Sequence, residues 1–229
     1  MAFVAKTEYF GNGSDSALAI TASEDGKSAA VATQPDDRGD VTANTVHSVY
    51  LAPSDTYDIK ADWSPDIVLG TVTTTDAHPI MLTSVVITTS AGACPTVVYS
   101  GVEVESGGST DATVAKVTPS VSHYHKAQDV CSAATVTGGN ITQCTTTISA
   151  EPTTPSADGV RVAHDIHGGS VVASMTIKAS TPGTAPTVAA ASNWIISSPL
   201  ATNNPNEDYP DYTVTLTKYL ASAEPTPGT

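Results

Sequence analysis

The sequence has few basic residues, few aromatic residues and no long hydrophobic run. Nine Lys and Arg stand against 23 Asp and Glu in 229 residues, which gives a formal net charge of −14. Proteins that bind duplex nucleic acid cluster Lys and Arg to displace counterions from phosphate, and nine scattered basic residues cannot do this. No segment approaches the roughly 18 apolar residues of a membrane span. We therefore expect neither sequence-specific binding to nucleic acid nor a membrane location.

Cysteine is also scarce, and its spacing fits neither a disulfide framework nor a zinc knuckle. The three cysteines are Cys94, Cys131 and Cys144, and no two of them form a C-x-x-C pair. We expect small, half-buried thiols in a reducing compartment, with a Cys131–Cys144 bridge as the alternative. The first ten residues contain no basic segment followed by an apolar one, which predicts either a protein used without secretion or a mature chain.

The usual signatures of enzymes are missing. The chain has no G-x-S-x-G elbow, no G-x-x-x-x-G-K-[ST] phosphate-binding loop and no complete dinucleotide fingerprint. Aromatic residues make up only 5% of it, too few for an aromatic-lined pocket, and we expect Trp63 and Trp194 to pack in a core. The paired carboxylates Asp36 and Asp37 lie in a polar stretch, not in apolar surroundings that raise a carboxyl pKa. These absences predict a non-enzymatic protein without catalytic residues or a cofactor.

The sequence does contain short stretches of alternating apolar and polar residues that are rich in Val, Ile and Thr. Gly, Pro, Asn and Asp bound these stretches, and their spacing is typical of an all-β sandwich or barrel. The best helical candidate is residues 122–134. The predicted strands lie at 46–51, 67–69, 85–89, 97–99, 102–104, 145–148, 160–162, 171–172, 176–177 and 212–219.

Three segments resemble later segments in the same order, which indicates an internal duplication. The similar pairs are residues 56–62 with 145–151, 87–97 with 177–188, and 111–114 with 211–214. The offset between partners grows along the chain, as insertions in loops would make it. We therefore predict two similar β-sandwich or barrel domains, 1–120 and 121–229. The first carries a long polar loop at about 23–44, and the second ends in a Pro/Thr-rich tail.

Four histidines form the arrangement in this sequence that most resembles a metal site. His123 and His125 share one face if their segment is a strand, an arrangement that many metal sites use. His164 and His167 form a second pair, which needs a turn at Gly168 to face one side. These four residues are weak candidates for ligands, and we expect exposed or hydrogen-bonded histidines without a metal.

Two other motifs have a simple structural explanation. Arg38-Gly39-Asp40 is an adhesion-type tripeptide, but its surroundings of Pro, Gly and Asp already require a turn. Residues 203–211 gather carboxylates and amides of the kind that bind Ca²⁺, without the spacing of an EF-hand. We expect a turn in the first case and a solvated loop in the second.

The remaining features are those of a structural protein. The chain combines the opening segment 1–13, β modules rich in Thr, Ala and Val, and a predicted turn at 162–169 between two strands. In these features it resembles bacteriophage virion structural proteins, and among them tail-tube proteins. The resemblance implies subunits that self-associate into stacked rings around a DNA channel, contact other virion proteins and assemble in the host cytoplasm. An acidic lumen would repel phosphate and let DNA pass, and three duplicated chains would supply six near-equivalent modules to a ring.

Three other functions stay open. A capsid decoration or head-fibre protein would use similar β-sandwiches as a clamp. A secreted adhesin or carbohydrate-binding module of tandem Ig-like domains would bind through Arg38-Gly39-Asp40 or residues 203–211. An enzyme would have to use the four histidines named above.

For a tube, residues 23–44 are the expected contact between subunits. The segment is long and polar, and its centre holds Asp36, Asp37, Arg38 and Asp40. Loops of this length without structure of their own are usually functional or disordered. We expect deletion of residues 27–40 to leave the domains folded and to abolish assembly.

Overall fold

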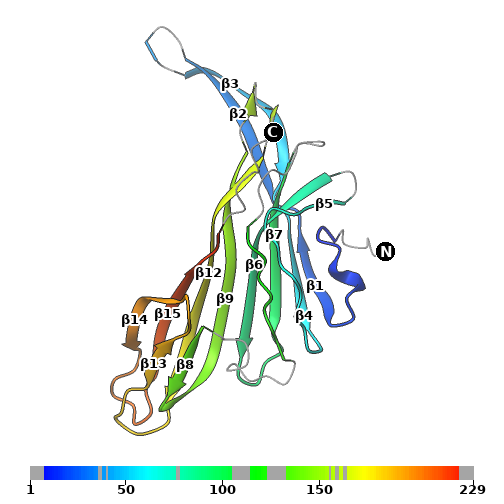
Figure 1. Ribbon diagram of the computed structural model, residues 1–229. Coiled ribbons are helices and arrows are strands. Elements are labelled where there is room, and N and C mark those ends of the chain that lie inside the picture. Colours follow the sequence, from blue (N-terminus) through cyan, green and yellow to red (C-terminus); the bar gives the residue numbers. More distant parts are fainter. Residues whose placement is uncertain are drawn as a thin grey trace, which may run out of the picture.

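The chain folds into antiparallel β-sheets (Figure 1). This computed structural model describes residues 8–35, 38–39, 41–75, 78–104, 114–122, 133–154, 156–157, 160–161 and 164–221. Within these ranges the one helical element is the 3-10 turn η1 (Asn12–Ser14). The same ranges contain no helix with the length and apolar character needed to cross a membrane. The all-β class predicted from the alternating pattern is confirmed.

The described residues form fifteen strands. In chain order they are β1 (Leu18–Glu24), β2 (Lys27–Pro35), β3 (Val41–Leu51), β4 (Ser54–Ile59), β5 (Val72–Thr75), β6 (His78–Ser90), β7 (Thr96–Glu103), β8 (Ala134–Thr137), β9 (Gly139–Thr153), β10 (Ser156–Ala157), β11 (Val160–Arg161), β12 (Asp165–Ala179), β13 (Thr187–Ala190), β14 (Ile195–Thr202) and β15 (Asp211–Tyr219).

Eight of these strands form one continuous path in the order β1-β4-β7-β6-β9-β12-β15-β14, and β5 pairs with β6 beside it. Every neighbouring pair along the path is antiparallel. Three separate two-stranded pairs join β2 to β3, β8 to β13 and β10 to β11. The early and late strands meet where β6 pairs with β9, from Ser84 opposite Ser149 to Ser90 opposite Gln143.

One face of the large sheet holds the core. Side chains alternate across a strand, so every second residue points to this face, and Val85 and Ile87 of β6 are completely buried there. Over the early strands the face is covered by residues 60–70 and 114–121, whose buried Trp63 belongs to the core as expected. Over β12 and β15 it is covered by the β8–β13 pair, and Trp194 packs against both parts.

The predicted division into two domains at residue 120 is not confirmed. Strands from both sides of that position form a single sheet through the β6–β9 pairing. The segments that resemble one another also take different places in it. In the first similar pair, Ile59 lies on β4 and Ile148 on β9; the second pair begins on β6 and on β12. In the sheet, β7 separates β4 from β6, whereas β9 pairs directly with β12. The similar segments 56–62 and 145–151 therefore do not occupy equivalent positions in the sheet, and residues 111–113 of the third pair lie outside the described residues.

Most of the predicted strands exist, but the structure joins or shortens several of them. Residues 171–172 and 176–177 belong to the single strand β12, and residues 97–99 continue through 103 in β7. Residues 67–69 form no strand, because Ile67 makes only an isolated bridge. The helical candidate 122–134 falls largely on residues 123–132, which lie outside the described residues.

The predicted turn at 162–169 is wrong for its last five residues. Residues 165–169 lie inside β12, where a register shift between His167 and Ser170 marks a bulge. Gly168 accommodates this bulge with a φ of 66°, a left-handed conformation that glycine adopts without strain. A glycine pair in a strand therefore bends the strand here instead of ending it.

The polar segment 23–44 is not an unstructured loop either. Its backbone pairs β2 with β3, from Lys27 opposite Leu51 to Pro35 opposite Val41. The first of these strands contains mainly Ala, Ser, Thr and Gln, with Val31 as its one β-branched aliphatic residue. Such a composition has weak β-propensity, so the sequence pattern did not reveal a strand.

The expectation of three reduced cysteines is wrong. Cys144 is buried on β9 and is disulfide-bonded, whereas Cys94 is a free, exposed thiol. The remaining cysteine, Cys131, lies outside the described residues. Spacing along the chain could not decide this, because a disulfide depends on the distance and direction between two Cβ atoms in the fold.

Candidate assembly surfaces

The β2–β3 hairpin projects beyond the end of the sheet (Figure 1). Among the described strands, β2 and β3 pair only with each other. Their sequences contain no Asp, Glu, Lys or Arg after Lys27, and Arg38 lies between them, at the tip of the hairpin. Arg38 is exposed at this tip, while Asp36, Asp37 and Asp40 lie outside the described residues. Of the four assembly residues predicted from the sequence, the structure therefore describes Arg38 alone, at the tip of a projecting hairpin.

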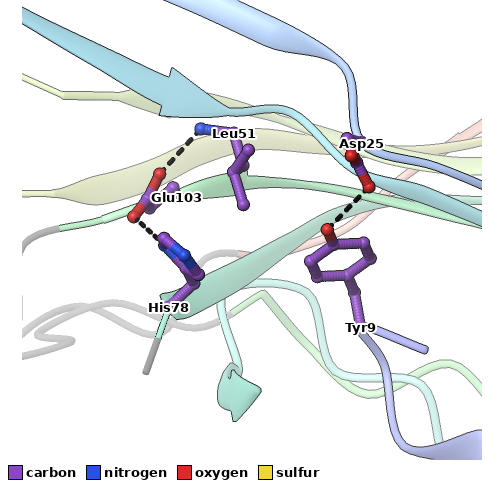
Figure 2. A network of polar contacts seen from close by, with 5 residues as sticks. All are labelled: Tyr9, Asp25, Leu51, His78 and Glu103. Atoms are coloured by element: carbon purple, nitrogen blue, oxygen red, sulfur yellow. Dashed lines mark hydrogen bonds and ion pairs between the residues drawn. The ribbon is translucent and has the colours of Figure 1, made fainter. Parts of the chain in front are cut away.

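Three polar contacts lie at the base of this hairpin (Figure 2). The Leu51 N–H at the end of β3 donates to Glu103 Oε2 at 2.7 Å, and Glu103 Oε1 lies 2.6 Å from His78 Nδ1. On the other side of the hairpin, the Tyr9 hydroxyl donates to Asp25 Oδ1 at 2.8 Å. Because Glu103 ends β7 and His78 begins β6, the large sheet itself orients the hairpin.

Sequence analysis missed these residues for a physical reason. Glu103 and Leu51 are 52 positions apart, and Glu103 and His78 are 25 apart. Neither a single carboxylate at a strand end nor a single histidine at a strand start forms a motif. Only the pairing of β6 with β7 brings the two side chains together.

The N-terminal segment is fixed to the sheet by a buried carboxylate. Asp55 of β4 is fully buried, and its Oδ2 accepts a hydrogen bond from the Tyr9 N–H at 2.7 Å. The Tyr57 hydroxyl donates to Glu8 Oε1 at 2.7 Å beside this group. Burial, followed by the two nearby carboxylates, raises the pKa of Tyr57 far above its ordinary value. Burial also raises the pKa of Tyr99, whose ring meets the Tyr57 ring edge to face.

The opposite face of the large sheet has no covering layer among the described residues, and we call it the hydroxyl face. Its side chains are half-buried or exposed, and none of its valines belongs to a core cluster. By the same alternation, Glu24 of β1 and the ion-paired Lys178 of β12 and Asp211 of β15 lie on this face with Asp58, so the surface is wide and carries few charges. Its members are Ser54, Thr56, Asp58, Ser84, Val86, Thr88, Ser90, Thr96, Val98, Ser100, Gln143, Thr145, Thr147, Ser149, Ser170, Val172, Ser174, Thr176, Thr213, Thr215 and Thr217.

The candidate histidines do not form a metal site within the described ranges. His164 is buried, and neither of its ring nitrogens has a hydrogen-bond partner there. His167 is exposed on β12, with Nδ1 3.2 Å from the Thr153 hydroxyl. No group of three His, Cys, Asp or Glu side chains in these ranges could hold a metal ion. The other pair, His123 and His125, lies outside the described residues.

The candidate Ca²⁺ loop is exposed from 203 to 209 and is held by an ion pair at its end. Lys178 Nζ lies 3.6 Å from Asp211 Oδ1 and 4.0 Å from Glu207 Oε2. The ammonium group therefore already neutralises carboxylates that a bound cation would need. This arrangement agrees with the solvated loop expected from the sequence.

A cavity of about 360 Å³ lies on the packed face, between the two parts of the core. Trp194, Lys116 and Lys218 line it together with apolar residues of β9 and β12. Lys116 is paired with Asp66 at 2.9 Å, and this bond, together with one from the Thr118 hydroxyl, lowers the pKa of Asp66. The described lining residues include no histidine or carboxylate that could act as a base toward a nucleophile.

Comparison with known proteins gives no relative: no protein-family signature matches the chain, and no curated protein is significantly similar to it. The hairpin, the hydroxyl face and the sheet edges therefore supply the grounds for a functional proposal.

Proposed function

We propose that the chain is a non-enzymatic structural subunit of a phage virion, and specifically a tail-tube subunit that assembles into stacked rings. The projecting β2–β3 hairpin carries this proposal. A two-stranded hairpin on its own is at best marginally stable in water. Long strands without charged residues are also poorly protected against pairing with other chains. A hairpin of this kind needs a second surface, which a neighbouring copy supplies in an assembly of identical subunits.

The hydroxyl face supports a role as the wall of a channel. Among its described residues the one basic side chain is Lys178, which is ion-paired with Asp211 and Glu207, so the face offers DNA phosphates no unpaired cation. The net charge of −14 repels DNA as a whole. A wall with few charges inside an acidic assembly would let DNA slide without sticking. One sheet built from eight strands would supply this wall whether or not it arose by duplication.

The proposal is tested by removing the hairpin while keeping its base. Ala29 and Val49 face each other across β2 and β3, so residues 30–48 can be replaced by Asn-Gly, which favours a tight two-residue turn. Deletion of 27–40 would instead leave β3 without its partner. We expect the full chain to form rings or tubes under negative-stain microscopy. The shortened chain should stay monomeric, with an unchanged circular dichroism spectrum and melting temperature.

Glu207→Gln, on the exposed loop before β15, is a suitable control because it should not affect assembly. If the full chain remains monomeric at high concentration, the proposal is wrong. If the shortened chain still forms tubes, the hairpin is not the contact. Binding to preformed capsids without ring formation would favour the decoration alternative.

A further inference from the structure

The large sheet has two open edges. Among the described strands, β1 pairs only with β4 and β14 pairs only with β15. The outer N–H and C=O groups of an edge strand are templates for pairing with another chain, and charged residues commonly protect them. β14 contains no charged residue, and β1 contains only Glu24 at its end. Both edges are therefore weakly protected.

A single row of paired residues crosses the sheet from one edge to the other. Its inner members Tyr57, Val97, Ile87 and Leu216 are completely buried, whereas its two ends are 42% and 41% exposed isoleucines. This row of core residues therefore reaches both edges of the sheet and ends at each edge in an exposed isoleucine. From edge to edge, the row consists of Ile20, Tyr57, Val97, Ile87, Thr146, Ala173, Leu216 and Ile196.

The directions of the two edge strands are compatible with each other. Because each of the seven steps from β1 to β14 is antiparallel, these strands run in opposite directions. A second copy placed with its β1 beside β14 therefore continues the antiparallel order and keeps its hydroxyl face on the same side. Such a contact joins different surfaces of two copies, so it repeats around an axis and can close into a ring.

We propose that β14 of one copy pairs with β1 of the next, with Ile196 packed against Ile20. This inference rests on the proposed function and names the lateral contact within a ring. In the adjacent row, Ile195, which is 58% exposed, would face Ala22. Pro199 has no N–H and lies at a register shift, which limits the pairing to the first half of β14.

Cross-linking between copies tests this contact. One variant carries Ile20→Cys and the other Ile196→Cys, both with Cys94→Ser to remove the exposed free thiol. A short bismaleimide joins free thiols and leaves the disulfide of Cys144 intact. The two variants, mixed under assembly conditions, should give a covalent dimer, and neither alone should. In the matched control, Val86→Cys on the central strand β6 replaces Ile20→Cys and should give no dimer.

A dimer formed by either variant alone would overturn the edge contact, because it would mean that like edges meet. Rings without any cross-linked dimer would overturn the edge contact and leave the proposed function standing. An unmodified chain that stays monomeric would contradict both.

A second pair of variants covers the case in which the cysteines themselves disturb the contact. Ile20→Lys and Ile196→Lys should each abolish rings without changing the melting temperature, because each places a charge at the pairing edge. Tyr219→Lys is the control, since Tyr219 is 73% exposed but lies on the inner strand β15. Rings formed by both isoleucine variants would overturn the proposal.

Discussion

The two faces of the large sheet are built from the same strands but differ in what covers them. On β6, Val85 and Ile87 point to the packed face and are completely buried, whereas Val86 and Thr88 point to the hydroxyl face and are half-buried. Val85 and Val86 are chemically identical neighbours. Their difference in exposure comes from the layer above each face, which is present on one side and absent among the described residues on the other.

This comparison shows that the presence of a β-branched residue does not by itself indicate whether its side chain is buried. Val and Thr fit the pleated surface of either face, so their alternation identifies a strand without saying which side is the core. A face rich in hydroxyl groups, with few charges, has no covering layer among the described residues of the single chain. In an assembly, such a face is suited to lining a channel or meeting a neighbour.

The largest difference between the faces is expected when a buried side chain is truncated. Ile87→Ala leaves a cavity in the packed core and should lower the free energy of unfolding by about 2–5 kcal/mol. Val86→Ala, one residue earlier on the same strand, should change it by about 0.5 kcal/mol. Urea unfolding of both variants in monomeric form measures the two values. Equal losses would show that the hydroxyl face is packed as tightly as the core.

The disulfide should produce the next largest effect. Cys144 lies on the packed face, and its replacement by Ser should cost roughly 2–4 kcal/mol, whereas Cys94→Ser at an exposed position should cost little. Thermal unfolding with and without reductant measures this. Since Cys94 is free, mass spectrometry of non-reduced peptides should find Cys131 joined to Cys144. A melting temperature that reductant does not change would contradict a stabilising disulfide.

High pH should produce the smallest effect, and again on the packed face. Tyr57 and Tyr99 have raised pKa values when folded, whereas tyrosines in the unfolded chain ionise near pH 10. The stability that results from these raised pKa values is fully present below about pH 10. It is lost as the pH rises from there toward the folded pKa values, by less than about 1.4 kcal/mol per pH unit for each tyrosine. Urea unfolding at a series of pH values above about 10 measures this loss.

Tyr57→Phe provides the control for this pH effect. The variant keeps the ring but cannot ionise at position 57, so its stability should fall less steeply above pH 10 than that of the unchanged chain. If both proteins lose stability at the same rate, the Tyr57 hydroxyl does not contribute to the alkaline transition.

Much of the secondary structure could be predicted because its signal is local. The alternating residues in β6, β7, β9, β12 and β15 identified these strands, although two short predictions merged into β12. β2 was not predicted, because it consists mainly of Ala, Ser, Thr and Gln. Arg38, at the tip of the hairpin, was singled out from the sequence, but the residues at its base were not. Glu103 and His78 carry no local pattern, since each acts only through a partner on another strand.

The sequence by itself determined the all-β class, the uncharged character of the hairpin strands and the scarcity of basic residues, because these depend on neighbouring residues or on composition. The tertiary structure decided the strand order, the covered face and the exposed isoleucines at both ends of one row. Those features depend on hydrogen bonds between strands far apart in the chain. Pairing β6 with β9 joins residues about sixty positions apart, and no local pattern specifies such a register.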